Sequence, residues 1–407
     1  MTQMRAMLRR GFTLIELLVA MVLMSLVIIA TFAFMSSMSG VFYSQDMIVD
    51  AQSSARFALD FVSMDVRRAG YLATPSAAAD NLVCPKPTTI NVPVRAIDIE
   101  DGATRSLDNN QVFGTGAPHF NRNIEPDRLV LMGSFDAPDM FKLDGVNAST
   151  ARLNPQSAAR VLGNGTPQEN EAAFANIFIA GRVVRVSDVD GTAQFGVINS
   201  ANFGGGTPTV NISGLVVNSG SLACGLQGVS GQSYELAVLN IYEYRVINRG
   251  DGTVEPEMDL IRTELRASGA PLTLPGGGVN QVPVAEYVVD FQVLAFGDRA
   301  GGLTPVMAAD QQGDDQGSLD IAFLDRTPDS LANWQRIREM QIVLSVRTPR
   351  EDPNMSHIQR QAENGARGTN YGLLATFDMD GDPFTAAHVV TLSTRVEVPN
   401  LTFANVR

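Results

Sequence analysis

The stretch that decides the fold is FTLIELLVAMVLMSLVIIATFAFM, residues 12–35. It holds 24 residues, and its single ionisable side chain is Glu16. As an α-helix it would be about 36 Å long, enough to cross a hydrocarbon core of about 30 Å. We therefore predict that residues 12–35 form a transmembrane helix.

The charges before this run predict its orientation. Residues 1–11 contain three arginines, Arg5, Arg9 and Arg10, and no acidic residue. Basic residues stay on the cytoplasmic side of a membrane segment, so we expect the chain from residue 36 onward to lie outside the cytoplasm. A secretory signal peptide would have a shorter apolar region followed by a small-residue cleavage site, and the segment SSMSGVFYSQ offers such a site only weakly.

Glu16 is the unusual residue of the apolar run. A carboxylate inside a membrane segment costs several kcal/mol and by default indicates a functional site with a partner. From this residue alone, the alternative that Glu16 lies near the cytoplasmic face and reaches the lipid headgroups stays open.

Residues 9–20, RRGFTLIELLVA, resemble the prepilin cleavage and methylation motif of type IV pilins and type II secretion pseudopilins. The resemblance implies that residues 1–11 are a leader peptide, cut off by a prepilin peptidase between Gly11 and Phe12. It also implies N-methylation of Phe12. In the family, the glutamate that corresponds to Glu16 neutralises the terminal amine of an adjacent subunit during assembly.

A helical pattern continues after the apolar run, over residues 36–70. Apolar residues recur at spacings of three, four or seven: Ile48, Ala55, Leu59, Val62 and Val66. Gly70 suits a helix end and Pro75 blocks extension. We predict one helix from Phe12 to about Ala69, roughly 87 Å long, with Gly40 as a weak point.

Residues 71–407 alternate short β-like segments with loops rich in Gly, Pro, Asn and Asp, which predicts a β-rich head domain. Two short helices are also expected, at Asp329–Ile337 and Pro283–Val289. The fold class is therefore α+β, with a long N-terminal helix packed on a mainly antiparallel sheet. The expected strands are Ile90–Ile99, Arg128–Met132, Ile177–Val186, Thr209–Val217, Tyr234–Val246, Met258–Arg266, Val288–Phe296, Leu319–Leu324, Met340–Arg347 and Val389–Val398.

The chain has two cysteines, Cys84 and Cys224, and no CxxC or Cys/His cluster. A structural zinc site is therefore not expected. If the head faces an oxidising compartment, we expect one disulfide between them. Two buried, unpaired thiols are the alternative, because the spacing cannot show that the sulfurs meet.

The segment DMDGD is the best metal candidate, because Asp378, Asp380 and Asp382 place three carboxylates at alternate positions, where they can converge on calcium. The glycine falls too early for an EF-hand loop, and Asp-Gly also favours tight turns. We expect turns here and at Asp188–Gly191, and hence no cofactor, with calcium as the alternative.

No enzyme motif is present. The three histidines, His119, His357 and His388, have no metal-binding spacing, and neither a GxSxG elbow nor a phosphate-binding loop occurs. The formal net charge of −13 argues against unaided binding to nucleic acid. We expect neither catalysis nor a nucleic-acid partner.

Further segments resemble the PilW family of minor pilins. They are Asp65–Tyr71, Val284–Phe296, Trp334 followed by Ile342–Thr348, and Val389–Arg407. The acidic turn often seen after the central strand in that family is reduced here to Gly297–Gly302.

The PilW resemblance implies a minor pilin that primes pilus assembly and sits near the tip. Its partners would be other major and minor pilins, the prepilin peptidase, the assembly platform and a tip adhesin. The helix would first lie in the inner membrane with the head in the periplasm, and later in a pilus at the cell surface. Two alternatives stay open: a minor pseudopilin of type II secretion, and a pilus-associated adhesin or ligand-binding subunit.

Overall fold

The computed structural model describes most of the 407-residue chain. The described residues are 13–100, 126–137, 139–162, 166–188, 190–204, 207–218, 224–227, 234–248, 258–299, 302–305, 335–351, 376–377 and 387–402. The chain divides into two compact units, Met1–Asp50 and Ala51–Arg407.

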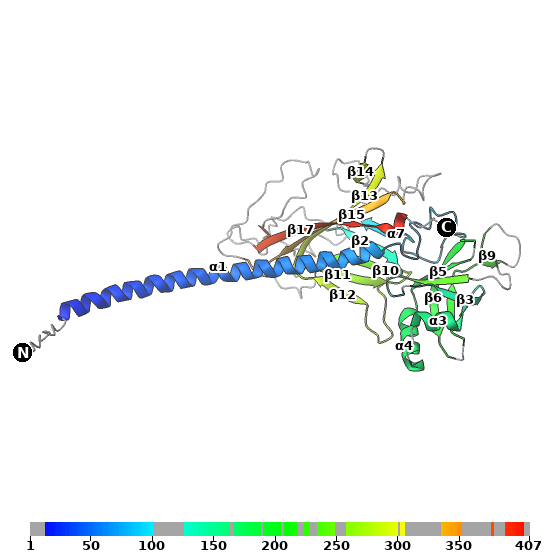
Figure 1. Ribbon diagram of the computed structural model, residues 1–407, viewed down its shortest axis with the longest axis horizontal. Coiled ribbons are helices and arrows are strands. Elements are labelled where there is room, and N and C mark those ends of the chain that lie inside the picture. The colour runs from blue at the N-terminus through cyan, green and yellow to red at the C-terminus, as the bar shows by residue number, and fades with distance from the viewer. Residues whose placement is uncertain are drawn as a thin grey trace, which may run out of the picture. The chain divides into compact units, whose positions relative to one another are not determined.

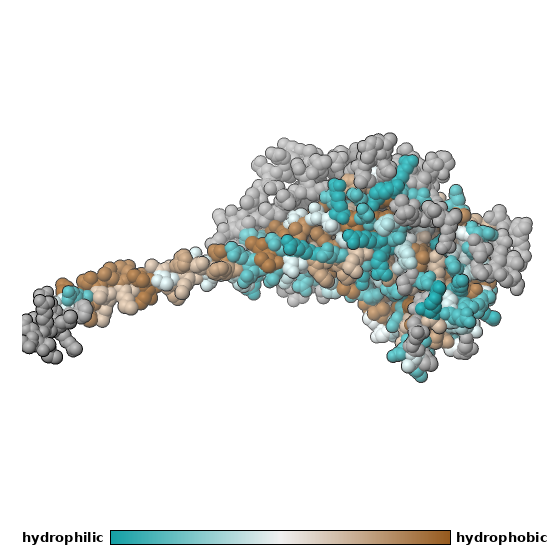
Figure 2. All heavy atoms as spheres, viewed as in Figure 1, coloured by the Kyte–Doolittle hydropathy of each residue, from teal (hydrophilic) through white to brown (hydrophobic). Residues whose placement is uncertain are grey.

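Helix α1 runs from Leu14 to Arg68 and contains 55 residues. This confirms the predicted long helix, and Gly40 does not interrupt it. In the first unit, the side chains of residues 14–35 are exposed, and Figure 2 shows them as a run of mainly brown, hydrophobic residues. Among the described residues, α1 is the helix that is long and apolar enough to cross a membrane.

The end of α1 is fixed against strand β2 (Arg128–Gly133). Gly70 has a φ of +78°, in the left-handed region that favours glycine. Its N–H donates to the carbonyl oxygen of Met132 over 2.8 Å. A Cβ at Gly133 would lie only 2.8 Å from the carbonyl oxygen of Arg68. Glycine at both positions therefore lets helix and strand approach closely.

From Ala51 onward, one face of α1 is buried in the largest apolar core. The helix contributes mostly small and branched side chains: Ala51, Ala55, Ala58, Leu59, Val62, Val66 and Ala69. They pack with strand residues that include Ile99, Leu131, Tyr244, Phe291 and Leu344. This packing, together with the sheets below, confirms the predicted α+β fold class, and burial of the stripe stabilises α1 on the strands.

Strand β10 (Tyr234–Asn248) is the longest strand among the described residues. Its two halves pair with different sets of strands. Its second half pairs antiparallel with β2 on one side and with β11 (Met258–Leu265) on the other. Tyr244, for example, lies opposite Leu129 and Arg262. β1 (Ile97–Glu100) flanks β2, and β12 (Gln281–Ala285) flanks β11.

The first half of β10 closes a barrel. The strands β3 (Phe141–Val146), β4 (Thr150–Leu153), β7 (Thr209–Ser213), β6 (Ala193–Asn202) and β5 (Val183–Ser187) pair in that order. Leu236 of β10 lies opposite Phe141 of β3 and opposite Val186 of β5. These pairings join the ends of the ladder, so six antiparallel strands form a closed ring, inserted between β2 and the second half of β10.

The barrel has its own apolar core, separate from the core around α1. Two helices, α3 (Pro155–Leu162) and α4 (Pro167–Ile177), connect β4 to β5. The ring of Phe178 lies 5.0 Å from that of Phe141 and 4.4 Å from that of Phe174, centroid to centroid. The connection therefore adds aromatic side chains to the barrel interior.

A second large sheet has the order β14 (Gly302–Pro305), β13 (Val288–Arg299), β15 (Ile337–Arg347), β17 (Ala387–Glu397) and β16 (Thr376–Phe377). All its pairs are antiparallel. The short helix α7 (Pro399–Thr402) follows β17. A small parallel pair consists of β8 (Val217–Asn218) and β9 (Leu226–Gln227). In Figure 1, β13, β15 and β17 lie side by side near α1 from Ala51 onward.

Several predicted elements are wrong or shorter than expected. Pro283–Val289 is not a helix: β12 and β13 occupy most of it, and Tyr287 has a φ of +57° at the turn between them. In Ile90–Ile99 the strand begins only at Ile97. The part of Ile177–Val186 before Val183 is the end of α4 and a turn.

Other predicted elements differ only in their bounds or cannot be compared. The predicted strand Thr209–Val217 divides into β7 and the start of β8. Leu319–Leu324 and residues 329–334 lie outside the described residues, and Ile337 begins β15 rather than ending a helix. The division into units falls within the predicted helical segment 36–70, between Asp50 and Ala51.

Candidate functional site

The N-terminal end of α1 holds one of the predicted site residues, Glu16. Its Oε2 accepts a hydrogen bond from the backbone N–H of Thr13 and another from Thr13 Oγ1, each 2.9 Å long. The N–H of Glu16 donates back to Thr13 Oγ1 over 3.3 Å. This reciprocal arrangement is a capping box, in which two side chains satisfy backbone groups that a helix start leaves unpaired.

The role of Thr13 at the helix start was not predicted from the sequence. The S/T-x-x-E spacing before an apolar run is the usual signature of a capping box, and Thr13 and Glu16 match it. Among the described residues, Oε1 of Glu16 has no hydrogen-bond partner. One carboxylate oxygen of Glu16 therefore caps the helix.

The other predicted residues of the N-terminal motif, Gly11 and Phe12, lie outside the described residues. The same holds for the calcium candidates Asp378, Asp380 and Asp382 and for His119 and His357. The weaker metal candidate, Asp188–Gly191, contains the expected turn: the N–H of Gly191 donates to the carbonyl oxygen of Asp188, and Gly191 has a φ of +85°. Within the described part of the chain, no group of His, Cys, Asp and Glu side chains could hold a metal ion.

Cys84 and Cys224 form a disulfide in the structure, with their Cα atoms 5.3 Å apart and 140 positions apart in sequence. The N–H of Cys84 donates to the carbonyl oxygen of Ala193 on β6. The disulfide and this hydrogen bond therefore both link the segment between α1 and β1 to the inserted part of the chain that forms the barrel.

A buried ion pair links the barrel to the sheet formed by β1, β2, the second half of β10, β11 and β12, which we call the main sheet. Arg182, which immediately precedes β5, contacts Glu264 of β11 through Nε (2.8 Å) and Nη2 (3.0 Å). Its Nη2 also lies 2.7 Å from Asp136 Oδ2. Asn240, at the point where β10 leaves the barrel, donates to both Glu264 and Asp136. Burial alone would lower the pKa of Arg182, but the adjacent Glu264 and Asp136 outweigh that effect and raise it.

The same arginine also fixes the end of α4. Its Nη1 donates to the carbonyl oxygens of Asn176 and Ile177, over 2.8 and 2.9 Å. Helix-terminal carbonyls carry partial negative charge and lack partners within the helix, so a cation there is favourable. Arg182 therefore joins α4, β5 and β11 in one buried polar cluster.

A second buried cluster joins α1 to the main sheet. Asp65 accepts hydrogen bonds at Oδ2 from the hydroxyl of Tyr244 and from Nη1 of Arg262, the latter 3.0 Å long. The guanidinium of Arg262 lies 4.3 Å from the ring centroid of Tyr242. Burial, reinforced by Asp65, raises the pKa of Tyr244 well above its usual value, so this hydroxyl remains a donor. Both clusters therefore join elements of the fold, and of the first cluster the Asp136 side chain is exposed.

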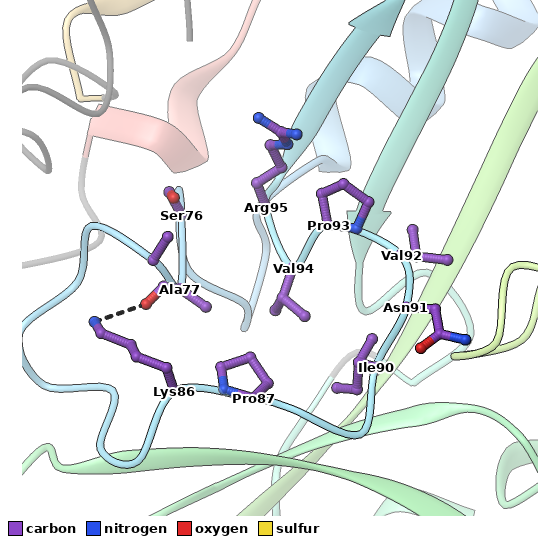
Figure 3. A pocket seen from close by; sticks show the side chains of 11 residues that line it. Ser76, Ala77, Lys86, Pro87, Ile90, Asn91, Val92, Pro93, Val94 and Arg95 are labelled. Carbon is purple, nitrogen blue, oxygen red and sulfur yellow. Dashed lines mark hydrogen bonds between the residues drawn. The ribbon is translucent and has the colours of Figure 1, made fainter. Parts of the chain in front are cut away.

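A pocket of ≈ 400 Å³ opens beside the segment between α1 and β1. Its wall is mainly apolar, with Ile90, Val92, Val94 and two prolines, and Lys86 lies at one side (Figure 3). The Lys86 ammonium donates to the carbonyl oxygen of Ala77 over 2.8 Å. Burial lowers the pKa of Lys86, an effect that Asp80 partly offsets. The ammonium also donates to the carbonyl oxygen of Asp80, and Arg95 is a second cation among the lining residues.

Comparison with known proteins agrees with the N-terminal motif. A model described as the prokaryotic N-terminal methylation motif matches residues 7–32, which confirms the motif predicted at residues 9–20. No curated protein was found to match the chain. Among solved structures, a type IV-like pilin from Thermus thermophilus is 12% identical, with 57% of this chain and 92% of that chain covered. Its TM-score of 0.19 is too low to establish a shared fold.

Proposed function

We propose that the chain is a subunit of a type IV pilus, of the minor pilin class, inserted into the fibre through α1. The observation that carries the proposal is the methylation motif at residues 7–32, followed directly by the apolar part of α1. A plain membrane anchor would explain the apolar side chains but not the motif.

Cleavage between Gly11 and Phe12 would make Phe12 the first residue and Glu16 the fifth. The new amine, methylated on Phe12, is a cation at the start of an apolar helix. A carboxylate in lipid is unfavourable unless it is paired. The uncapped Oε1 of Glu16 offers the acceptor that a neighbouring subunit's amine requires, and at about 4 Å such a pair gains about 4 kcal/mol at an effective dielectric constant of 20.

The head supports a low-copy role rather than that of the major repeating subunit. The second unit runs from Ala51 to Arg407 and carries a whole inserted barrel beyond the sheets that pack on α1. We propose that the chain primes assembly and lies near the fibre tip, beside other minor pilins and a tip adhesin. Before assembly it would sit in the inner membrane, with its head in the periplasm, in contact with the prepilin peptidase and the assembly platform.

The two alternatives differ in their use of the head. A minor pseudopilin of type II secretion would carry the same N-terminal motif, and its partners would belong to that secretion system. An adhesin or ligand-binding subunit would use the barrel or the pocket beside Lys86. We propose no enzymatic activity and no resident cofactor, and calcium at Asp378, Asp380 and Asp382 stays a prediction.

The test is recovery of the chain from fibres. A tagged chain expressed in its native cells should appear in sheared surface fibres and disappear from that fraction when the prepilin peptidase is deleted. Deletion of the major pilin should also remove it. Retention of the chain in the membrane fraction, with intact fibres and an active secretion system, would support the pseudopilin alternative instead.

A further inference from the structure

A long uncharged stretch of sequence forms one wall of the barrel. The 44 residues 191–234 contain no Asp, Glu, Lys, Arg or His, although 18% of the chain is charged and a stretch of this length would average about eight such residues. The stretch contains β6 and β7. Protein surfaces normally mix charged side chains of both signs, so the outer side of these two strands is unusual. We call it the amide–hydroxyl face, and its residues are Asn199, Ser200, Asn202, Thr209, Asn211 and Ser213.

The alternation of the strands separates this face from the barrel core. Ile198, Val210 and Ile212 are buried inside the barrel, so the polar side chains between them lie on its outer side. Four residues of the face are exposed, and Thr209 and Ser213 are half-buried. Both strands lie entirely within the described residues, and neither exposes a large apolar side chain.

A β-bulge adds one more amide to the face. Ile198 lies opposite Ile212, but the next paired residue of β6 is Ser200, which lies opposite Asn211. The extra residue is Asn199, and its Oδ1 accepts a hydrogen bond from Oγ of Ser213 over 3.3 Å. Bulges re-aim side chains and are common next to functional sites. Here the bulge leaves two consecutive polar side chains of one strand exposed.

Hydrogen bonds across three strands hold the face in one arrangement. Nδ2 of Asn211 donates to Oγ of Ser200 over 2.8 Å, and its Oδ1 accepts from Oγ1 of Thr150, on β4, over 3.1 Å. A side-chain amide has two donors and two acceptor lone pairs, and these bonds use one of each. Asn211 is exposed, so it retains hydrogen-bonding capacity for a ligand. Side chains that are already fixed lose little conformational entropy on binding.

We propose that the amide–hydroxyl face binds a neutral carbohydrate, whose hydroxyl groups exchange hydrogen bonds with Asn199, Ser200 and Asn211. Sugar hydroxyls both donate and accept, as do the amides and hydroxyls of this face. A ligand without charge cannot compensate the cost of removing water from a charged side chain. A surface that such a ligand covers is therefore favoured when it carries no charge.

The composition of the face disfavours other classes of ligand. Protein interfaces are enriched in aromatic side chains, Met and Arg and depleted in Ser, the reverse of what β6 and β7 expose. Calcium needs carboxylates, and nucleic acid needs several cations. The face has neither, and one cation, Arg152 of β4, lies at its border opposite Thr209.

Glycan binding by the full-length chain in detergent tests the inference. The probe is an array of neutral hexose and N-acetylhexosamine oligosaccharides, with sialylated and sulfated ones beside them. We expect binding to at least one neutral member, with little change between about 0.05 and 0.5 M salt, because screening acts only on charges. Binding to no member, or binding confined to anionic members that Arg152 would attract, would overturn the inference.

Two variants locate the site. Asn211→Asp removes the amide donors and adds a negative charge, whereas Asn199→Lys adds a positive one. Each should weaken binding of the neutral oligosaccharide by at least about tenfold. Gln281→Glu and Gln281→Lys are the matched controls, because Gln281 is an exposed amide on β12 whose Nε2 also donates to a hydroxyl of the neighbouring strand, that of Thr263, over 3.1 Å. The control variants should bind as the native chain does.

Thermal unfolding followed by circular dichroism shows whether each variant folds, and Asn199→Lys, at the exposed bulge, carries the test if Asn211→Asp does not fold. Opposite effects of the two variants would indicate a charged partner, and unchanged binding in both would place the sugar elsewhere; either result would overturn the inference. Sugar binding by a chain that is absent from sheared fibres would support this inference while contradicting the proposed fibre role.

Discussion

Oε2 of Glu16 accepts two hydrogen bonds from Thr13, from its backbone N–H and its Oγ1, each 2.9 Å long. Glu16 therefore has a role within its own helix besides the role that we propose for it between subunits. The two roles use different properties of the side chain, because capping needs an acceptor oxygen whereas pairing with a neighbour's amine needs negative charge.

The first prediction separates these roles with Glu16→Gln and Thr13→Ala. Glutamine also completes a capping box, so Glu16→Gln retains the helix start but loses the charge. We expect it to lower recovery in sheared fibres by at least about tenfold, with leader cleavage largely intact, and Glu16→Ala to do the same. Thr13→Ala keeps the charge and loses a cap worth about 1 kcal/mol, so it should have the smaller effect.

Quantitative blotting of fibre and membrane fractions measures this outcome. If Glu16→Gln assembles normally while Thr13→Ala fails, then Glu16 acts only as a helix cap and the intersubunit ion pair is not needed.

The second prediction concerns the buried pair Arg182–Glu264. Arg182→Met leaves the Glu264 carboxylate buried without its cation, which should lower the free energy of unfolding by about 3–5 kcal/mol. Arg160→Met is the matched control, because Arg160 pairs with Asp139 over 2.6 Å but both side chains are largely exposed. That change should cost about 1 kcal/mol or less.

Chemical denaturation of the purified full chain, followed by tyrosine fluorescence and circular dichroism, gives both values. Similar losses for Arg182→Met and Arg160→Met would show that the buried cluster does not hold the barrel on the sheet.

The third prediction concerns the disulfide Cys84–Cys224. It closes a loop with a sequence separation of 140, for which chain-entropy arguments give about 4–5 kcal/mol. We expect the double variant Cys84→Ser/Cys224→Ser to unfold at a markedly lower temperature and the native chain to approach it when a reductant is added. Titration of free thiols in protein isolated from the periplasm checks the bond in the cell; two titratable thiols would mean that it does not form there.

The fourth prediction concerns the barrel wall. A Cβ at Gly196 of β6 would clash with the side chain of Ile212 and lie 2.8 Å from the carbonyl oxygen of Ser213. Gly196→Ala should therefore cost about 1–3 kcal/mol through strain. Gly145→Ala, on β3, is the control, because a Cβ there meets no atom within 4 Å. Thermal unfolding compares the two, and equal midpoints would contradict the close packing of β6 on β7.

The sequence predicted the parts of the fold that depend on local patterns. The extent of α1 follows from the apolar run, from apolar residues spaced three and four apart, and from Gly70 at its end. All three features lie within one segment of sequence and do not depend on contacts with distant residues. The strands β2, β10, β11, β13, β15 and β17 were also expected, because each has a long apolar or alternating pattern.

The barrel was not predicted, since its closure depends on β10 pairing with β3 and β5 at the same residues, and no local pattern encodes that contact. The helix α4 was not predicted. Its start nevertheless carries a signal visible in the sequence, because Thr166 and Glu169 form a capping box and Pro167 is the first helical residue. The cluster around Arg182 could not be foreseen because its partners come from distant segments.

Mass spectrometry of the N-terminus of the full chain, extracted from membranes of its native cells, tests the central claim most directly. The account predicts a mature chain that begins at Phe12 with a methylated amine, and loss of this species when the prepilin peptidase is deleted. A chain that keeps residues 1–11 in wild-type cells would contradict it, because the amine that Glu16 is proposed to pair with would not exist.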